Sequence, residues 1–209
     1  MFAGLSDLIF HPDAFFERVS RENVNLIPPV AIVVAGISVL LLPGIFTILY
    51  FSMTGRGIIG YVSLMGMIQF YFKSVFFLPL VTWAAMSLGT YGISRMLDGK
   101  GTLALIVQNT GYGMMPWTLS GIGLTVFSGV LLLAANIFPA DMISVGEFAS
   151  NAYFFYMFIS VAIFLWQWYL WVLAVRHTNG FSVARALGVT ILPAIILVWL
   201  TTPLMIFVK

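Results

Sequence analysis

The chain has 209 residues, of which 61% are hydrophobic and 8% are charged, and its mean hydropathy is +1.07. A soluble domain carries about 25% charged residues, so this composition excludes an ordinary water-facing domain and predicts an integral membrane protein. The net charge of +2 gives no argument for nucleic-acid binding. Because the sequence contains no cysteine, it excludes disulfides, thiolate nucleophiles and cysteine-based metal sites.

Residues 1–27 form the only extended segment of mixed polarity. Within residues 12–22, Phe15, Phe16 and Val19 fall on one side of a helix, and charged residues surround them. Two adjacent phenylalanines are costly to leave in water. We therefore expect a cytoplasmic amphipathic helix that lies in the membrane interface, with a solvated tail as the alternative.

Residues 28–209 contain five long apolar stretches, and a bilayer-spanning helix needs roughly 20 apolar residues. The stretches are continuous, whereas barrel strands would alternate in polarity. The predicted fold is therefore an all-α, polytopic bundle of five transmembrane helices. The expected spans are residues 28–52, 70–95, 104–137, 152–176 and 184–208. A tight turn at residues 176–180 leads to Ser182, the expected N-cap of the last helix.

Basic residues indicate how these spans are oriented. One side of the five-span arrangement holds six of them and the other side holds three. The six are Arg18, Arg21, Arg95, Lys100, Arg176 and Arg185, and the three are Arg56, Lys73 and Lys209. The positive-inside rule then places the N-terminus in the cytoplasm and the C-terminus outside. The expected location is the cell membrane of a prokaryote.

Proline interrupts four of the five spans, at Pro43, Pro79, Pro116 and Pro193 with Pro203. Each proline removes a backbone hydrogen bond and kinks its helix. Ordinary bending within a packed bundle is the simpler interpretation, because prolines are common in membrane helices. The alternative is a set of broken helices that lines a pathway.

Small residues recur every four positions along the third span, at Gly121, Thr125 and Gly129. This spacing lets helix backbones approach closely. We interpret the three as helix-packing positions within the chain, with a homodimer face as the alternative.

Chemistry-bearing side chains are few. Gln108, Asn109 and Gln167 are polar residues within spans, and no predicted span contains an aspartate or glutamate. Both histidines, His11 and His177, are expected to be polar loop residues. No catalytic, nucleotide-binding or metal-binding motif occurs, so we expect no enzyme activity, no cofactor and no metal.

Three segments carry a family likeness: HPDAFFERV at 11–19, GYGMMP at 111–116 and RHTNGFSVARALGVTILP at 176–193. Together they resemble the Yip (Ypt-interacting protein) family of small five-span membrane proteins. The resemblance implies a five-helix membrane bundle with a cytosolic N-terminus. It also makes Gly111, Tyr112 and Pro116 the counterparts of the family's third-helix motif, and we expect these three residues to be structural.

Eukaryotic members of that family act in vesicle traffic and bind prenylated Rab GTPases. This sequence departs from their pattern, because it lacks the long cytosolic N-terminal region and the acidic Asp-Leu-Tyr-Gly-Pro type motif. Rab-type GTPase binding is therefore not carried over, and a prokaryotic-type member is expected. The expected function is non-enzymatic membrane organisation or partner recruitment. A small transporter, channel or lipid-moving protein that uses proline-broken helices is the alternative.

Overall fold

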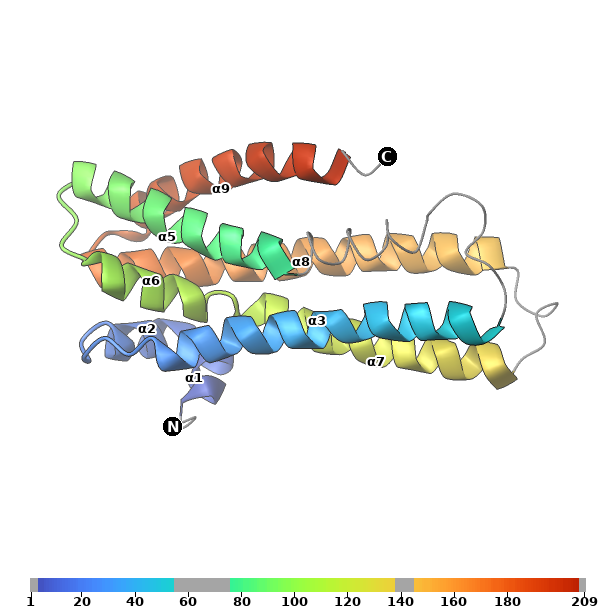
Figure 1. Ribbon diagram of the computed structural model, residues 1–209. Coiled ribbons are helices and arrows are strands. Elements are labelled where there is room, and N and C mark those ends of the chain that lie inside the picture. Colours follow the sequence, from blue (N-terminus) through green and yellow to red (C-terminus); the bar gives the residue numbers. More distant parts are fainter. Residues whose placement is uncertain (1–3, 55–75, 138–144, 207–209) are drawn as a thin grey trace.

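Every element in the described part of the chain is an α-helix. The computed structural model describes residues 4–54, 76–137 and 145–206 (Figure 1). The helices are α1 (Leu5–Phe10), α2 (Pro12–Val19), α3 (Ile27–Thr54), α5 (Leu78–Met96), α6 (Leu103–Tyr112), α7 (Met115–Ile137), α8 (Val145–Asn179) and α9 (Val183–Ile206). The prediction of an all-α fold is confirmed.

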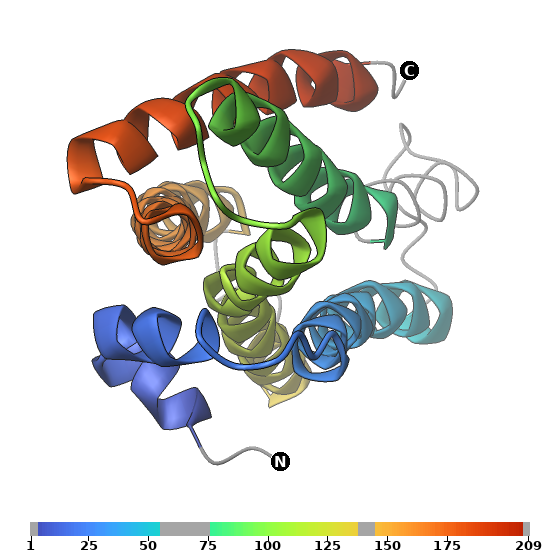
Figure 2. The same cartoon turned by 90° about the vertical axis from the view of Figure 1, so that its left-hand side faces the viewer.

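Packing follows a simple order of neighbours. Helix α3 packs against α7, α5 lies between α6 and α9, and α8 contacts α6, α7 and α9. The short helices α1 and α2 lie at one end of the bundle, where α2 contacts α8. Figure 2 shows this end, with α1 and α2 on the side of the bundle opposite α9.

The amphipathic helix predicted in residues 12–22 is present as α2, but protein covers its apolar face. Phe15, Phe16 and Val19 are all buried, and Phe15 makes an edge-to-face contact with Tyr112 of α6 at 5.0 Å between ring centroids. Protein and not lipid therefore covers this face, and the solvated-tail alternative is wrong, while the place of α2 in the membrane interface stays a prediction. The physical reason is that α2 packs against α8 and buries the phenylalanines there.

The third predicted span, residues 104–137, is two helices and not one. Helix α6 ends at Tyr112, and α7 begins at Met115 after a turn at Gly113 and Met114. Pro116 lies in the first turn of α7 and has no N–H to donate to the carbonyl of Tyr112. A break therefore replaces the expected kink. By contrast, α3 continues through Pro43, and α9 continues through Pro193 and Pro203.

The turn predicted at residues 176–180 is also wrong, because α8 continues to Asn179. Gly180 follows with φ of 69°, a left-handed conformation that glycine adopts freely at a helix end. The N-cap predicted at Ser182 is confirmed, since Ser182 Oγ accepts a hydrogen bond from Arg185 N at 3.3 Å. Pro79 lies in the first turn of α5, and residues 70–75 of the predicted second span lie outside the described residues.

Large apolar side chains form exposed stripes along three helices at the spacing of one helical face. They are Ile122, Val126 and Val130 on α7, Phe158, Val161 and Leu165 on α8, and Leu187, Ile191 and Ile195 on α9. Among the described residues, Phe158–Asn179 is the one helical stretch that is long and apolar enough to cross a membrane. Ile27–Leu42 and Val183–Ile196 are shorter apolar helical stretches. The count of five spans stays a prediction.

Six basic residues that the sequence assigned to one side do lie at one end of the bundle. Arg18 and Arg21 belong to the α1–α2 region and Arg176 to the end of α8, while Arg95, Lys100 and Arg185 surround the loops next to it (Figure 1). The other three basic residues lie outside the described residues. Which side of a membrane this end faces stays a prediction.

Candidate functional site

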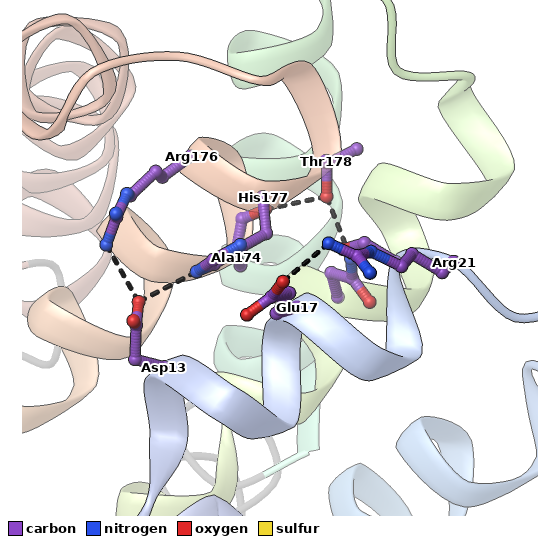
Figure 3. A network of polar contacts seen from close by, with 9 residues as sticks. Asp13, Glu17, Arg21, Ala174, Arg176, His177 and Thr178 are labelled. Atoms are coloured by element: carbon purple, nitrogen blue, oxygen red, sulfur yellow. Dashed lines mark hydrogen bonds and ion pairs between the residues drawn. The ribbon is translucent and has the colours of Figure 1, made fainter.

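A cluster of polar side chains lies where α1 and α2 meet the ends of α6 and α8 (Figure 3). We call this cluster the N-terminal clasp. It consists of Asp13, Ser20 and Asn25 from the N-terminal segment, Gln108 and Asn109 from α6, and Arg176, His177 and Thr178 from α8.

Asp13 of α2 forms the charged part of the clasp. Its Oδ1 accepts hydrogen bonds from Arg176 Nη1 at 2.8 Å and from His177 Nε2 at 2.7 Å. The hydrogen bond from His177 lowers the pKa of the Asp13 carboxyl below its ordinary value of 3.8, while partial burial opposes the shift. The charges of His177 and Arg176 add to the lowering. The carboxylate is therefore held in its ionised form against the last turn of α8.

Asn109 forms the buried part of the clasp and has no exposed surface. Its Nδ2 donates to Ser20 Oγ at 2.9 Å and to Thr178 Oγ1 at 2.8 Å. Thr178 in turn donates to Ala174 O at 2.6 Å within α8. One amide group thus joins the N-terminal segment, α6 and α8. The Oδ1 of Asn109 is also buried and has no hydrogen-bond partner among the described residues.

Gln108 holds the chain that leads from α2 into α3. Its Oε1 accepts a hydrogen bond from the backbone N–H of Asn25 at 2.5 Å. The side chain of Asn25 then accepts from the N–H of Ile27, the first residue of α3, at 3.1 Å. Adjacent residues of α6 therefore fix two points of the N-terminal segment.

The turn between α5 and α6 lies tightly against the end of α8. Asn179 Oδ1 accepts from Gly101 N at 3.1 Å, and Asn179 Nδ2 donates to Val175 O. A Cβ at Gly99 would lie 2.5 Å from Asn179 Oδ1, and a Cβ at Gly101 would lie 2.5 Å from Thr178 Cγ2. A larger residue at Gly99 or at Gly101 would therefore push this turn away from α8.

The residues of the third-helix motif pack beside the clasp. A Cβ at Gly111 would lie 2.7 Å from Pro29 Cβ and 2.9 Å from Trp83 Cζ2, so α3 and α5 both approach α6 closely here. Tyr112 is buried against Phe15, and Pro116 is buried in the first turn of α7.

The break between α6 and α7 is filled by side chains of α8. A Cβ at Gly113 would lie 2.3 Å from Trp171 Cδ1. Trp171 Nε1 donates to Thr110 O at 3.1 Å, and Gln167 Nε2 donates to Met114 Sδ at 3.2 Å. The backbone carbonyl of Thr110, in the last turn of α6, therefore has a donor from α8.

The three small residues of α7 differ in their surroundings. A Cβ at Gly121 would lie 2.9 Å from Leu40 Cγ of α3, and Thr125 Oγ1 donates to Val39 O of the same helix at 2.9 Å. At Gly129, by contrast, a Cβ would meet no heavy atom of the other described helices within 4 Å. The homodimer alternative for this face stays a prediction.

The clasp joins the N-terminal segment, α6 and α8 through hydrogen bonds and an ion pair. Groups of three or more His, Cys, Asp or Glu side chains that could hold a metal ion do not occur in the described part of the chain. His177 and Asp13 form a pair like a base and its orienting carboxylate, but no hydrogen bond joins His177 to a hydroxyl nucleophile among the described residues. His11 is exposed and precedes α2, and its side chain makes no capping hydrogen bond.

Sequence reasoning identified Asn109 and Gln108 as buried polar residues but missed their partners. It also treated His177 as a loop residue, whereas His177 lies in the last turn of α8. The signal that could have corrected this was Gly180, because a glycine after a polar run commonly marks the residue beyond a helix end.

Comparison with protein families gave a match to the Yip1 domain. The model of the Yip1 domain matches residues 6–202, which include the clasp and every long helix apart from the last residues of α9. Comparisons with curated proteins and with solved structures gave no match.

Proposed function

The chain belongs to the Yip1-domain family, and from that premise we propose that it is a non-enzymatic, multi-pass membrane protein that recruits a protein partner at the membrane. The exposed apolar stripes of α7, α8 and α9 support this proposal, because an apolar surface of this extent is costly in water. In this proposal the bilayer surrounds the bundle, and the α1–α2 end faces the cytoplasm.

The observation that carries the proposal is the N-terminal clasp. Its charged and amide groups are engaged between elements, so they stabilise a surface and leave no free set of acid, base and nucleophile. Helices α1 and α2 thereby form a fixed outer face at one end of the bundle. Phe10 and Glu22 are exposed on this face and are available to a partner.

The alternative is a small transporter, channel or lipid-moving protein, and the break between α6 and α7 is the observation that favours it. Broken helices line the binding sites of many transporters. Here, however, Trp171 and Gln167 occupy the surroundings of the break. Partner recruitment is therefore the better-supported function. Rab-type GTPases are not included as partners, since the acidic motif is missing.

Photo-crosslinking in the native membrane tests the proposal. A photoreactive residue at Phe10 or at Glu22 should give a discrete protein adduct, while the same residue at Val126 on the apolar stripe of α7 should give none. The variant Asp13→Asn should weaken the adducts at Phe10 and Glu22, because it loosens α2. Absence of adducts at all three positions, together with ion or lipid flux in vesicles that contain the purified protein, would favour the alternative.

A further inference from the structure

Three cationic side chains converge on the turn Leu97–Gly101, between α5 and α6. Arg95, near the end of α5, points Nη1 at Gly99 O over 3.5 Å. Arg185, in the first turn of α9, donates through Nη2 to Leu97 O. Lys100 lies within the turn and is exposed. We call these three side chains the basic corner.

The basic corner differs in charge balance from the neighbouring α1–α2 region. In that region each arginine faces a carboxylate: Arg18 is paired with Asp7, Arg21 with Glu17 and Arg176 with Asp13. No ion pair of this kind involves the three cations of the basic corner in the part of the chain that the structure describes. Asp98 is the single acidic residue of the turn, so three positive charges and one negative charge leave a surplus of two.

Exposed apolar side chains lie close in sequence to two cations of the basic corner. Met96 is 83% exposed and follows Arg95 in the sequence, and Val183 is 53% exposed and lies two residues before Arg185. The Arg185 guanidinium also lies over the ring of Phe181 at 4.6 Å from its centroid, which holds its plane in place. Cations beside exposed apolar side chains at a membrane-facing helix end match the two parts of a phospholipid, its phosphate and its acyl chains.

We propose that the basic corner binds the headgroup of an anionic phospholipid from the leaflet at the α1–α2 end. The inference rests on the membrane placement given under the proposed function. The surplus charge favours an anionic headgroup over a zwitterionic one, and the apolar neighbours favour a lipid over free phosphate.

Native mass spectrometry of the purified full chain tests the site with two probes, phosphatidylglycerol and phosphatidylcholine. Phosphatidylglycerol should remain bound to a larger fraction of the protein than phosphatidylcholine does. Lys100→Gln and Arg185→Gln should each lower its affinity about fivefold, which corresponds to about 1 kcal/mol for each charge near a membrane surface. Lys100→Gln is the first choice because Arg185→Gln also removes the contact with Leu97 O. Arg21→Gln is the matched control, since Arg21 is 77% exposed and already paired.

The proposal is overturned if Lys100→Gln and Arg185→Gln leave the affinity for phosphatidylglycerol unchanged, or if Arg21→Gln lowers it equally. It is also overturned if inorganic phosphate or an acidic peptide displaces the lipid at equal concentration, because the site would then recognise free anions or protein. If phosphatidylglycerol binding does not depend on Lys100 and Arg185 but photo-crosslinking at Phe10 is retained, the lipid site is refuted. The proposed function is not refuted by that outcome.

Discussion

Asn109 shows how one buried amide can organise several elements. Both hydrogens of its Nδ2 are used, one toward the N-terminal segment and one toward α8. A buried polar group that loses its partner costs about 1–3 kcal/mol. Substitution of Asn109 therefore affects the two hydroxyl groups that it contacts as well as its own helix.

Asn109→Ala should lower the free energy of unfolding by about 1–3 kcal/mol, because Ser20 and Thr178 both lose a donor. Thermal denaturation in detergent measures the change. Ser38→Ala is the control, since Ser38 is exposed and bonds only to Val34 O of its own helix. An equal effect of the two substitutions would show that Asn109 does not join the elements.

Asp13 gives the docking of α2 a defined dependence on pH. The folded pKa of this carboxyl is below its ordinary value of 3.8, so the ionised form stabilises the docked segment above that pH. This contribution is lost as the pH falls through the folded pKa. A spin label at Ala14, an exposed position of α2, should therefore be more mobile at an acidic pH below the folded pKa of Asp13 than at pH 6.

In Asp13→Asn the label should be mobile at both pH values, because the ionised partner of Arg176 and His177 is gone. Glu17→Gln should keep the wild-type behaviour, since Glu17 pairs only with the exposed Arg21. If acidification increases the mobility of the label in Asp13→Asn as strongly as in the wild-type protein, another carboxyl group must cause the effect.

At the scale of elements, α3 and α7 pack against each other at Gly121 and Thr125 of α7. Gly121→Leu should lower the free energy of unfolding by about 1–3 kcal/mol, because a Cβ there already meets Leu40 at 2.9 Å. Gly123→Leu is a matched control on the same helix, since a Cβ at Gly123 meets no heavy atom of another described helix within 4 Å. Thermal denaturation compares the two, and equal destabilisation would contradict the packing account.

The long helices could be predicted from sequence because their apolar stretches are continuous and the loops between them are short. The break at Gly113 and Met114 could not, since an apolar run looks the same whether a proline bends or ends the helix. The polar residues from Arg176 to Asn179 resembled a loop, although Gly180 ends the helix after them. Local patterns thus predict which residues are helical more reliably than where a helix stops.

The site was harder to predict than the helices. The sequence marks Gln108 and Asn109 as unusual, but their partners depend on the path of the N-terminal segment. Asp13 and Arg176 are 163 residues apart in sequence and meet only because α2 packs against α8. Spacing along the chain carries no signal for such a contact.

At the scale of the whole molecule, polar and apolar surfaces are segregated. The α1–α2 end carries the clasp and six basic residues, and exposed apolar stripes follow the lengths of α7, α8 and α9. This segregation is the arrangement expected of a bundle that crosses a bilayer with its basic end in the cytoplasm.

Cysteine labelling in intact cells tests this arrangement most directly, and the chain contains no native cysteine that would interfere. Glu22→Cys and Asp98→Cys place exposed thiols at the α1–α2 end, and Asp141→Cys places one in the loop expected outside, which lies beyond the described residues. A membrane-impermeant reagent should label Asp141→Cys in intact cells and should label the other two only after the membrane is opened. Labelling of Asp98→Cys and Asp141→Cys from the same side would contradict the account.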